Sequence, residues 1–211
     1  ATPKSDPLGA AVFLDGGAVR VDGTMAPLAV LQNGGPASSE LTLGSAGRLT
    51  VNGDFQQAGN GEIVFELAGA GANQFGKLVV GDRARLDGGI GLRSVGGFTP
   101  AIGATFEIIS AADGFLRTQF DSSLVADLGG SALWGITYDA DSVLAQVVSN
   151  TMLGDLNHDG AFDAADWATY ITWAQSNLSG LSPAQAYDRG DLNLDGVNNL
   201  ADMDLFMDAF D

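Results

Sequence analysis

Short apolar stretches separated by Gly, Asp and Asn dominate the first 150 residues of the chain. Apolar and polar positions alternate within these stretches, which is the pattern of β-strands with one buried face. No helical periodicity of comparable strength occurs over the same residues. The predicted strands are Ala18–Val21, Leu41–Leu43, Leu49–Val51, Ile63–Leu67, Lys77–Val80, Ile90–Val95, Thr105–Ile109, Leu133–Tyr138 and Val143–Val148.

Two pairs of neighbouring strands are spaced like antiparallel hairpins. One pair is Trp134–Tyr138 with Val143–Val147, and the other is Ile90–Val95 with Thr105–Ile109. Consecutive hairpins favour an antiparallel β-sandwich or jelly roll over a parallel coil. We therefore predict a Gly-rich, all-β domain of this kind over residues 1–150.

A short internal echo supports an alternative fold. The segment Gly47-Arg-Leu-Thr-Val-Asn-Gly-Asp54 is similar to Gly76-Lys-Leu-Val-Val-Gly-Asp82. Repeats of this kind occur in β-solenoids, whose successive coils stack on one another. A short β-solenoid is the second prediction for the domain.

Helical periodicity replaces the strand pattern after residue 150, so we predict a second, small α-helical domain over residues 151–211. Ser182-Pro-Ala-Gln185 has the capping Ser, the first-turn Pro and the returning Gln that begin a helix. Two further helices are expected from apolar residues spaced i, i+3, i+4 and i+7. These residues are Trp167, Tyr170, Ile171 and Ala174, and Met203, Phe206, Met207 and Phe210.

Two nearly identical heptads precede these apolar stripes. They are Gly154-Asp-Leu-Asn-His-Asp-Gly160 and Gly190-Asp-Leu-Asn-Leu-Asp-Gly196. Each begins a twelve-residue loop with oxygen-bearing side chains at positions 1, 3, 5, 9 and 12 and Gly at position 6. The side-chain ligands expected are Asp155, Asn157, Asp159, Asp163 and Asp166 in the first loop and Asp191, Asn193, Asp195, Asn199 and Asp202 in the second.

This spacing suits calcium, which takes six to eight oxygen ligands and tolerates a flexible cage. Gly at position 6 permits a sharp turn, and the backbone carbonyls of Ala161 and Val197 at position 7 add another oxygen to each set. We expect two EF-hand-like loops that hold two calcium ions. The first loop has four carboxylates and the second three, so tighter binding is predicted for the first.

The usual EF-hand has Glu at position 12, whereas both loops have Asp there. In this respect Gly154–Phe210 resembles a type I dockerin, a duplicated calcium-loop-and-helix module. The resemblance implies docking into a cohesin-like domain and assembly outside the cell. Recognition pairs of the family at loop positions 10 and 11 often contain Ser or Thr, whereas this chain has Ala164-Ala165 and Leu200-Ala201.

The β-domain has a looser resemblance. Leu49-Thr-Val-Asn-Gly-Asp-Phe, Gly61-Glu-Ile-Val-Phe-Glu-Leu and Leu133-Trp-Gly-Ile-Thr-Tyr are similar to the Gly-rich β-segments near the ends of autotransporter-like and surface-repeat bacterial proteins. Proteins of that kind are exposed at the cell surface. The resemblance therefore implies a structural role.

Acidic residues outnumber basic ones by 26 to 9, and the formal net charge is −17. Nucleic acids and anionic membrane surfaces select Lys and Arg, so neither is expected as a partner. No apolar run approaches the length of a membrane span, and we expect no membrane insertion. The last 61 residues contain 11 Asp, no Glu and a single base, Arg189, which indicates that bound cations compensate them.

The chain contains no Cys and begins at Ala1. A start without Met fits a mature chain after removal of a signal peptide, or a piece cut from a larger protein. Together with the two resemblances, this start leads us to expect an extracellular or cell-surface location.

No catalytic constellation is recognisable. The single His, His158, lies at loop position 4, where we expect it to face solvent. Carboxylate pairs for sugar hydrolysis are conceivable among Glu40, Glu62, Glu66 and Glu107, but a half-exposed strand explains them more simply. Trp134 and Tyr138 fit core packing better than a sugar-stacking platform. We expect no enzyme activity.

The main prediction is a secreted, non-catalytic structural protein that assembles through calcium-dependent docking. Its partner would be a cohesin-like domain or the β-domain of another copy, which could give a homo-oligomer, a head-to-tail filament or a surface layer. The alternative is the C-terminal part of a larger secreted polysaccharide hydrolase, in which the β-domain is a spacer or carbohydrate-binding module and the dockerin-like segment is the anchor.

Overall fold

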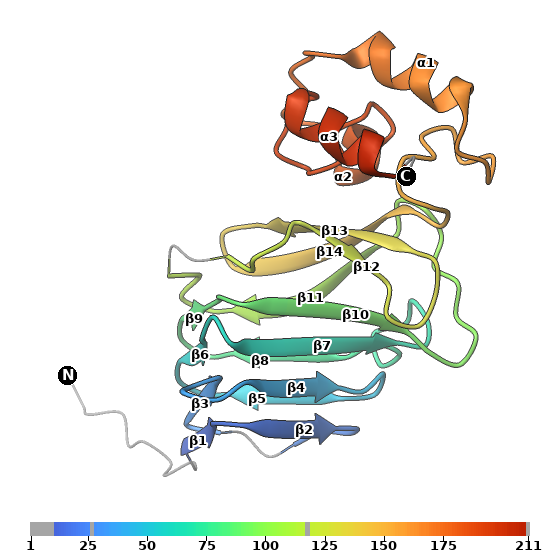
Figure 1. Ribbon diagram of the computed structural model, residues 1–211. Helices are drawn as coiled ribbons and strands as arrows, with labels where there is room; N and C mark the ends of the chain where they lie inside the picture. The colour runs from blue at the N-terminus through green and yellow to red at the C-terminus, as the bar shows by residue number, and fades with distance from the viewer. Residues whose placement is uncertain (1–10, 26–27, 117–118, 210–211) are drawn as a thin grey trace.

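The computed structural model describes residues 11–25, 28–116 and 119–209, which form a mainly β fold with three sheets and three short helices (Figure 1). Sheet 1 contains β1 (Ala11–Leu14), β3 (Val30–Asn33), β6 (Phe55–Gln57) and β9 (Ala84–Arg85). Sheet 2 contains β2 (Gly17–Val21), β4 (Ser39–Leu43), β7 (Gly61–Leu67) and β10 (Gly89–Ser94). Sheet 3 contains β5 (Arg48–Val51), β8 (Lys77–Val80), β11 (Thr105–Ala111), β14 (Ser142–Ser149), β13 (Leu133–Tyr138) and β12 (Leu124–Ala126).

The chain visits the three sheets in turn and rises by one strand at each return. All pairs within sheets 1 and 2 are parallel, as are β5 with β8 and β8 with β11. Isolated parallel bridges from Thr24 to Arg48 and from Leu28 to Val51 complete the third side of the first coil. The strands therefore stack as successive coils, with β1 and β2 at one end and β12–β14 at the other (Figure 1).

The prediction of an antiparallel sandwich is wrong for these coils, and the alternative, a short β-solenoid, describes their course. Ile90–Val95 and Thr105–Ile109 do not form a hairpin, because β10 pairs with β7 and β11 pairs with β8 and β14. Among the described strands, antiparallel pairing occurs only within β11–β14, where the predicted hairpin of Trp134–Tyr138 and Val143–Val147 is confirmed.

The internal echo has a direct structural meaning. Leu49 of β5 lies beside Leu78 of β8, and Val51 lies beside Val80. All four of these side chains are buried in the solenoid interior. The two similar segments thus occupy the same position in adjacent coils, so their matching apolar residues form continuous rows inside the stack.

A row of buried amides runs through one corner of the stack, where sheet 1 gives way to sheet 2. Asn33 and Gln57 are completely buried, and Asn33 Nδ2 donates to Gln57 Oε1 over 3.1 Å. Gln57 Nε2 reaches the backbone carbonyls of Asp87 and Gly89 in the next coil, at 2.7 and 2.8 Å. Because each polar atom in this row has a partner, the amides fix the register of three coils at little cost in desolvation.

A second cross-coil contact lies on the outer face of sheet 2. Glu66 of β7 accepts two hydrogen bonds from the Arg20 guanidinium of β2, at 2.7 and 2.5 Å, and a third from Arg93 of β10 at 3.3 Å. The Glu66 side chain is only 7% exposed, and the hydrogen bonds from Arg20 hold the pKa of its carboxyl below the usual value. The bidentate pair joins strands that are not neighbours in the sheet.

Replacement of Glu66 by Gln is expected to lower the free energy of unfolding by about 1–3 kcal/mol at pH 7, because the charged hydrogen bonds are lost. A carboxyl whose pKa is lowered by folding stabilises the fold at pH values above its pKa in the unfolded chain. This stabilisation is lost as the pH falls through its pKa in the folded protein. The difference between wild type and Glu66→Gln in urea denaturation should therefore shrink below about pH 4.5. Glu62→Gln, at an exposed position of β7, is the control and should change stability by less than about 0.5 kcal/mol. A gap for Glu66→Gln that is independent of pH would contradict the assignment.

The helices all follow the last strand. They are α1 (Ala164–Trp173), α2 (Pro183–Tyr187) and α3 (Leu200–Asp208), and they lie together at the β12–β14 end of the stack (Figure 1). Ser182 caps α2 with the reciprocal Gln185 bond expected from the sequence. The predicted apolar stripes are only partly buried: Tyr170 and Phe206 are in the core, whereas Ile171 and Met207 are about half exposed. Phe210 lies outside the described residues.

Candidate cation site

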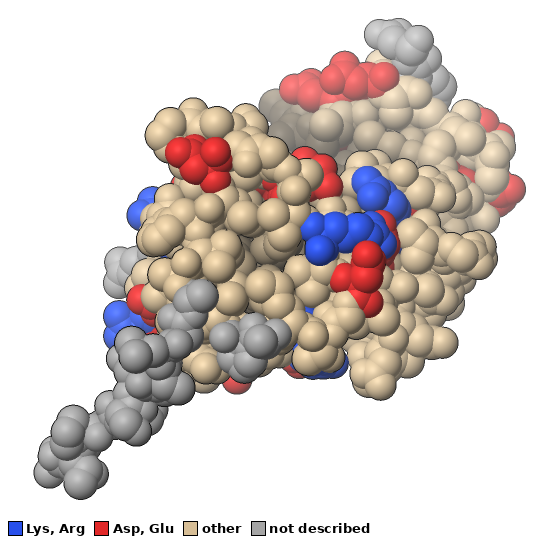
Figure 2. Space-filling view, turned by 90° about the horizontal axis from the view of Figure 1, so that it is seen from below, with Lys and Arg blue, Asp and Glu red and all other residues tan. Residues whose placement is uncertain are grey.

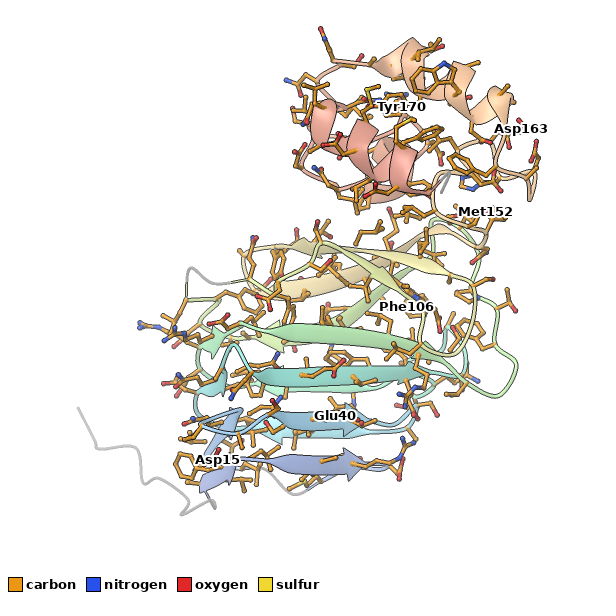
Figure 3. All side chains as sticks on the ribbon, in the orientation of Figure 1. Asp15, Glu40, Phe106, Met152, Asp163 and Tyr170 are labelled. Atoms are coloured by element: carbon orange, nitrogen blue, oxygen red, sulfur yellow. The ribbon has the colours of Figure 1, made fainter. Side chains whose placement is uncertain are left out.

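Each of the two predicted loops ends by capping a helix. Asp163 and Asn199, at loop position 9, are the N-cap residues of α1 and α3. Asp166 and Asp202, at position 12, return hydrogen bonds to the N-cap backbone and complete a capping box in each case. Figure 3 shows Asp163 where the chain enters α1. The loop spacing and the helix start are thus one local structure, repeated twice.

The carboxylates at positions 1 and 12 are buried inside the loops. Asp155, Asp166, Asp191 and Asp202 are each at most 1% exposed. In the second loop Asp202 Oδ1 accepts hydrogen bonds from the backbone of Leu192 at 2.7 Å and Asn193 at 3.0 Å. Asp166 repeats this arrangement in the first loop. Side chains that carry charge are therefore held inward by backbone N–H groups.

The turn within each loop is also the same. His158 and Leu194, at position 4, both have φ of 58°, and Gly160 and Gly196, at position 6, have φ of 85° and 90°. The N–H of Gly196 donates to Asp191 Oδ2 at 2.9 Å, and the first loop has the equivalent bond to Asp155. A left-handed conformation at position 6 requires Gly, as the spacing predicted.

The second loop brings three carboxylates together. Oxygen atoms of Asp191, Asp195 and Asp202 all lie within 4.8 Å of one another. Among the described residues this is the one such group of three, because Asp155, Asp159, Asp163 and Asp166 of the first loop do not form a second. The prediction that the first loop binds more tightly therefore has no support in this geometry and stays a prediction.

The remaining predicted ligands of both loops form hydrogen bonds within their own loop, so not all of their oxygens are free to face a cation. Asn193 and Asn199 donate amide hydrogens to Asp195 Oδ2, at 3.1 and 3.3 Å, and Asn157 donates to Asp159 at 2.9 Å. The carbonyl of Val197 accepts a hydrogen bond from Asn199, and the N–H of Ala161 donates to Asp159. For a cation to use these asparagines, their amides must turn and exchange donor for acceptor.

The all-oxygen donor set fits a hard divalent cation such as calcium. Burial raises the pKa of Asp191 to about 6 and also raises the pKa of Asp202. Burial therefore disfavours the bare ionised form of both carboxylates and favours binding of a proton or a cation. Asp191, Asp195 and Asp202 would hold the ion, with Asn193, Asn199 and the Val197 carbonyl available to complete its shell.

In metal-free protein, Asp191→Asn is expected to raise the free energy of unfolding of the helical region at pH 7 by about 1–3 kcal/mol. The pKa of this carboxyl is about 6 in the folded protein and lower in the unfolded chain. The fold is therefore most stable at pH values below the unfolded-chain pKa, and its stability falls as the pH rises through 6. The helical circular dichroism signal in chelator at pH 4.5 and 7.5 tests this, because the metal-free wild type is expected to lose its helices at the higher pH. The advantage of the variant should be present at pH 7.5 and largely absent at pH 4.5. Asp113→Asn, at an exposed position of the β-domain, should show no such dependence.

His158 does not face solvent, which corrects the expectation from its loop position. Its Nε2 lies 2.7 Å from Asp188 Oδ1, and its ring stacks on Tyr187 with an interplanar angle of 17°. The hydrogen bond with Asp188 raises the pKa of His158. The left-handed backbone at position 4 turns this side chain away from the loop centre and against the end of α2.

Two tyrosines that were not expected in the site fasten the loops to other elements. The hydroxyl of Tyr187 accepts the N–H of Gly154 at 3.0 Å, and that of Tyr170 donates to the carbonyl of Asn199 at 2.9 Å. Tyr170 belongs to α1 but holds the second loop, and Figure 3 shows it between α1 and α3. Tyr170 was recognised only as an apolar position, and Tyr187 had no sequence signal beyond its place before the second loop.

The acidic residues considered for sugar hydrolysis have separate surroundings. Glu66 is held by arginines, and Glu107 of β11 forms an ion pair with Lys77. Glu40 and Glu62 are neighbours in the register of β4 and β7 and line a shallow hollow on sheet 2. Trp134 is completely buried, so it cannot form an exposed sugar platform.

Comparison with protein-family models finds no match to the chain, and comparison with curated proteins finds no relative. None of the described helices is long and apolar enough to cross a membrane. The function of the protein is therefore inferred from the geometry of its loops and surfaces.

Proposed function

We propose that this chain is a secreted or cell-surface structural protein without catalytic activity, which docks to a protein partner through a calcium-dependent helical module. The convergence of the Asp191, Asp195 and Asp202 carboxylates supports the proposal most directly. The first loop repeats the backbone turn and the capping box around Asp155 and Asp166, so a second ion is assigned to it. Two dockerin-like, EF-hand-like calcium loops account for the acid content of residues 151–211.

Exposed apolar side chains on the helical region support a docking role. Leu200 is 76% exposed, Ile171 51% and Met207 48%. Several large exposed apolar side chains on a small, strongly acidic module would suit a surface that binds another protein. The partner is a cohesin-like domain or the β-domain of another copy.

The ends of the solenoid limit how copies can join. At one end β1 and β2 each pair with a single strand among the described residues, so each has an open edge. The other end is covered by β12–β14 and the helices (Figure 1). Viewed from the β1–β2 end, most of the surface is uncharged, with small groups of basic and acidic residues (Figure 2). A head-to-tail filament or layer would therefore join the helical region of one copy to the β-domain of the next, which is a heterologous contact.

Sedimentation velocity of the full chain with 5 mM calcium and with excess chelator tests the docking proposal. We expect calcium-dependent species larger than a monomer, or calcium-dependent capture of a cohesin-like domain added in trans. Leu200→Asp should weaken either interaction, whereas Asp113→Asn on the β-domain should not. A chain that binds calcium, stays monomeric at high concentration and captures no such domain would refute docking.

One observation favours the alternative of a spacer or carbohydrate-binding module attached to a larger secreted hydrolase. A hollow of about 180 Å³ is lined by Phe98, Thr99, Ser131 and Asn150, among others, and the buried Oδ1 of Asn150 has no hydrogen-bond partner. An aromatic ring beside an unpaired polar atom suits a sugar unit. Retention of the chain on insoluble polysaccharides, lost in Asn150→Ala, would support this alternative over self-assembly.

A further inference from the structure

The second loop packs directly on the β-domain. Leu194, at loop position 4, points out of the loop onto β13, where Gly135 leaves room for it. A Cβ atom at Gly135 would lie 2.7 Å from Pro183 Cβ and 2.8 Å from Leu194 Cδ1. Any larger residue at position 135 would therefore push both the loop and the start of α2 off the strand.

Hydrogen bonds cross the same junction. Ser123 Oγ donates to the carbonyl of Asn193 at 2.6 Å, and the N–H of Ala184 donates to Gln146 Oε1 of β14 at 3.1 Å. Asn193 is itself at loop position 3, between two of the converging carboxylates. A change in the backbone of the second loop is therefore transmitted to Ser123, which precedes β12.

An apolar cluster continues from the strands into the helices. Val148 of β14 is buried together with Tyr187, Leu192 and Phe206, and Leu133 of β13 packs against them. Leu192 is at position 2 of the second loop, and its N–H donates to Asp202. Leu192 thus buries its side chain between the helices and the strands, while its backbone N–H orients the cation ligand Asp202.

The first loop shares the buried leucine at position 2, because Leu156 belongs to the same apolar cluster, but its position 4 makes no contact with the β-domain like that of Leu194. Its position 4 is His158, which packs on Tyr187 and Asp188 of the helical region itself. The two heptads differ at this one position only, and its side chain packs on β13 in the second loop and on the end of α2 in the first.

We infer that cation binding by the second loop locks the helical region onto the end of the β-solenoid, with Leu194, Leu192 and Asn193 as the coupling residues. Calcium in this loop and order in β12–β14 therefore stabilise each other, as thermodynamic linkage requires. The second ion thus has an internal structural role, and the position-4 contact through Leu194 is specific to its loop. The inference rests on the proposed cation site and adds its coupling to the β-domain.

Calcium titration calorimetry combined with hydrogen–deuterium exchange of the full chain tests the coupling. In the wild type, calcium should slow exchange of β12–β14 amides at least tenfold. Leu194→Ala should weaken one calcium site about five- to tenfold and remove most of that protection, because binding no longer closes the junction. Leu116→Ala is the control: it shortens an exposed leucine of the β-domain, outside the loops and the proposed docking surface, and should change neither quantity.

A second variant, Ser123→Ala, removes only the hydrogen bond to Asn193 and should reduce the protection in the same direction by a smaller factor. Calcium binding in the wild type without any change in β12–β14 exchange would overturn the coupling and leave the proposed function standing. Unchanged affinity and protection in Leu194→Ala would also overturn it. An absence of calcium binding in the wild type would overturn both proposals.

Discussion

Removal of calcium from the full chain is expected to melt the helical region while the β-solenoid stays folded. The loops hold four almost completely buried carboxylates, and without a cation their mutual repulsion and desolvation oppose folding. An ion present at about 1,000 times its dissociation constant stabilises the bound fold by about 4 kcal/mol per site. The helical signal in circular dichroism should therefore be lost in chelator and regained on addition of calcium.

Variants of the position-12 carboxylates separate the two sites. Asp202→Ala should weaken one calcium site about 100-fold or more in titration calorimetry, which corresponds to about 2.7 kcal/mol. Asp166→Ala should do the same for the other site. Asp204→Ala is the matched control, because Asp204 is an exposed residue of α3 two positions further on.

These variants also decide the order of affinity. Four carboxylates in the first loop predict that the site lost in Asp166→Ala is the tighter one. The close approach of Asp191, Asp195 and Asp202 favours the opposite order. Helices that persist unchanged in excess chelator, with no heat of calcium binding, would contradict the assignment of both sites.

Replacement of Trp134 by Ala is expected to lower the free energy of unfolding of the β-domain by about 3–5 kcal/mol. Trp134 is completely buried, its ring meets Phe106 edge-on at 5.6 Å, and its Nε1 donates to Asp127 Oδ2 over 3.2 Å. Figure 3 shows Phe106 among the side chains inside the stack. Removal of the indole would leave a cavity and deprive a nearly buried carboxylate of one of its donors.

Urea denaturation monitored by far-ultraviolet circular dichroism measures this loss. Trp134→Phe retains an aromatic ring and loses mainly the hydrogen bond, so about 1–2 kcal/mol is expected. Phe13→Ala removes an aromatic residue that is 65% exposed and should cost less than about 1 kcal/mol. A loss for Trp134→Ala as small as that for Phe13→Ala would refute the packing described for the core.

Nine strands were predictable because their apolar residues alternate, whereas the four strands of sheet 1 and β12 were missed. Sheet 1 was missed because its strands are two to four residues long, and β3 and β6 contain polar residues that are buried. Asn33 and Gln57 face inward and satisfy each other, so the alternation that identifies a strand is absent there. A buried amide row is visible only once the coils are stacked.

The direction of pairing could not be read from the strands. A hairpin and a coil of a solenoid both present short strands separated by Gly-rich turns, and the partner of β10 is decided by contacts about 27 residues away along the chain. The similar segments that contain Leu49 and Leu78 were the one sequence signal for parallel stacking. Because the echo covers only eight residues, the hairpin spacing outweighed it.

The turns and caps of the loops were predictable because the contacts that form them are local. Capping by Asp163 and Asn199 and the turn at Gly160 and Gly196 depend on residues within the same twelve positions. The contacts of Leu194 with Gly135 and of His158 with Asp188 join residues 30 or more positions apart along the chain. The heptads differ at this position, but the loop pattern does not show what His158 and Leu194 contact, so their different roles required the fold.

The stacked coils make the β-domain nearly one-dimensional, since each strand of sheets 1 and 2 pairs only with its immediate neighbours. In such a lattice, stability is a sum of coil and neighbour terms, and disruption spreads like the opening of a zipper. In the described β1–β2 coil each strand pairs with a neighbour on one side only, whereas the opposite end of the stack is covered by β12–β14. Fraying should therefore begin at β1–β2 and travel in one direction, which gives the molecule a built-in polarity under mechanical load.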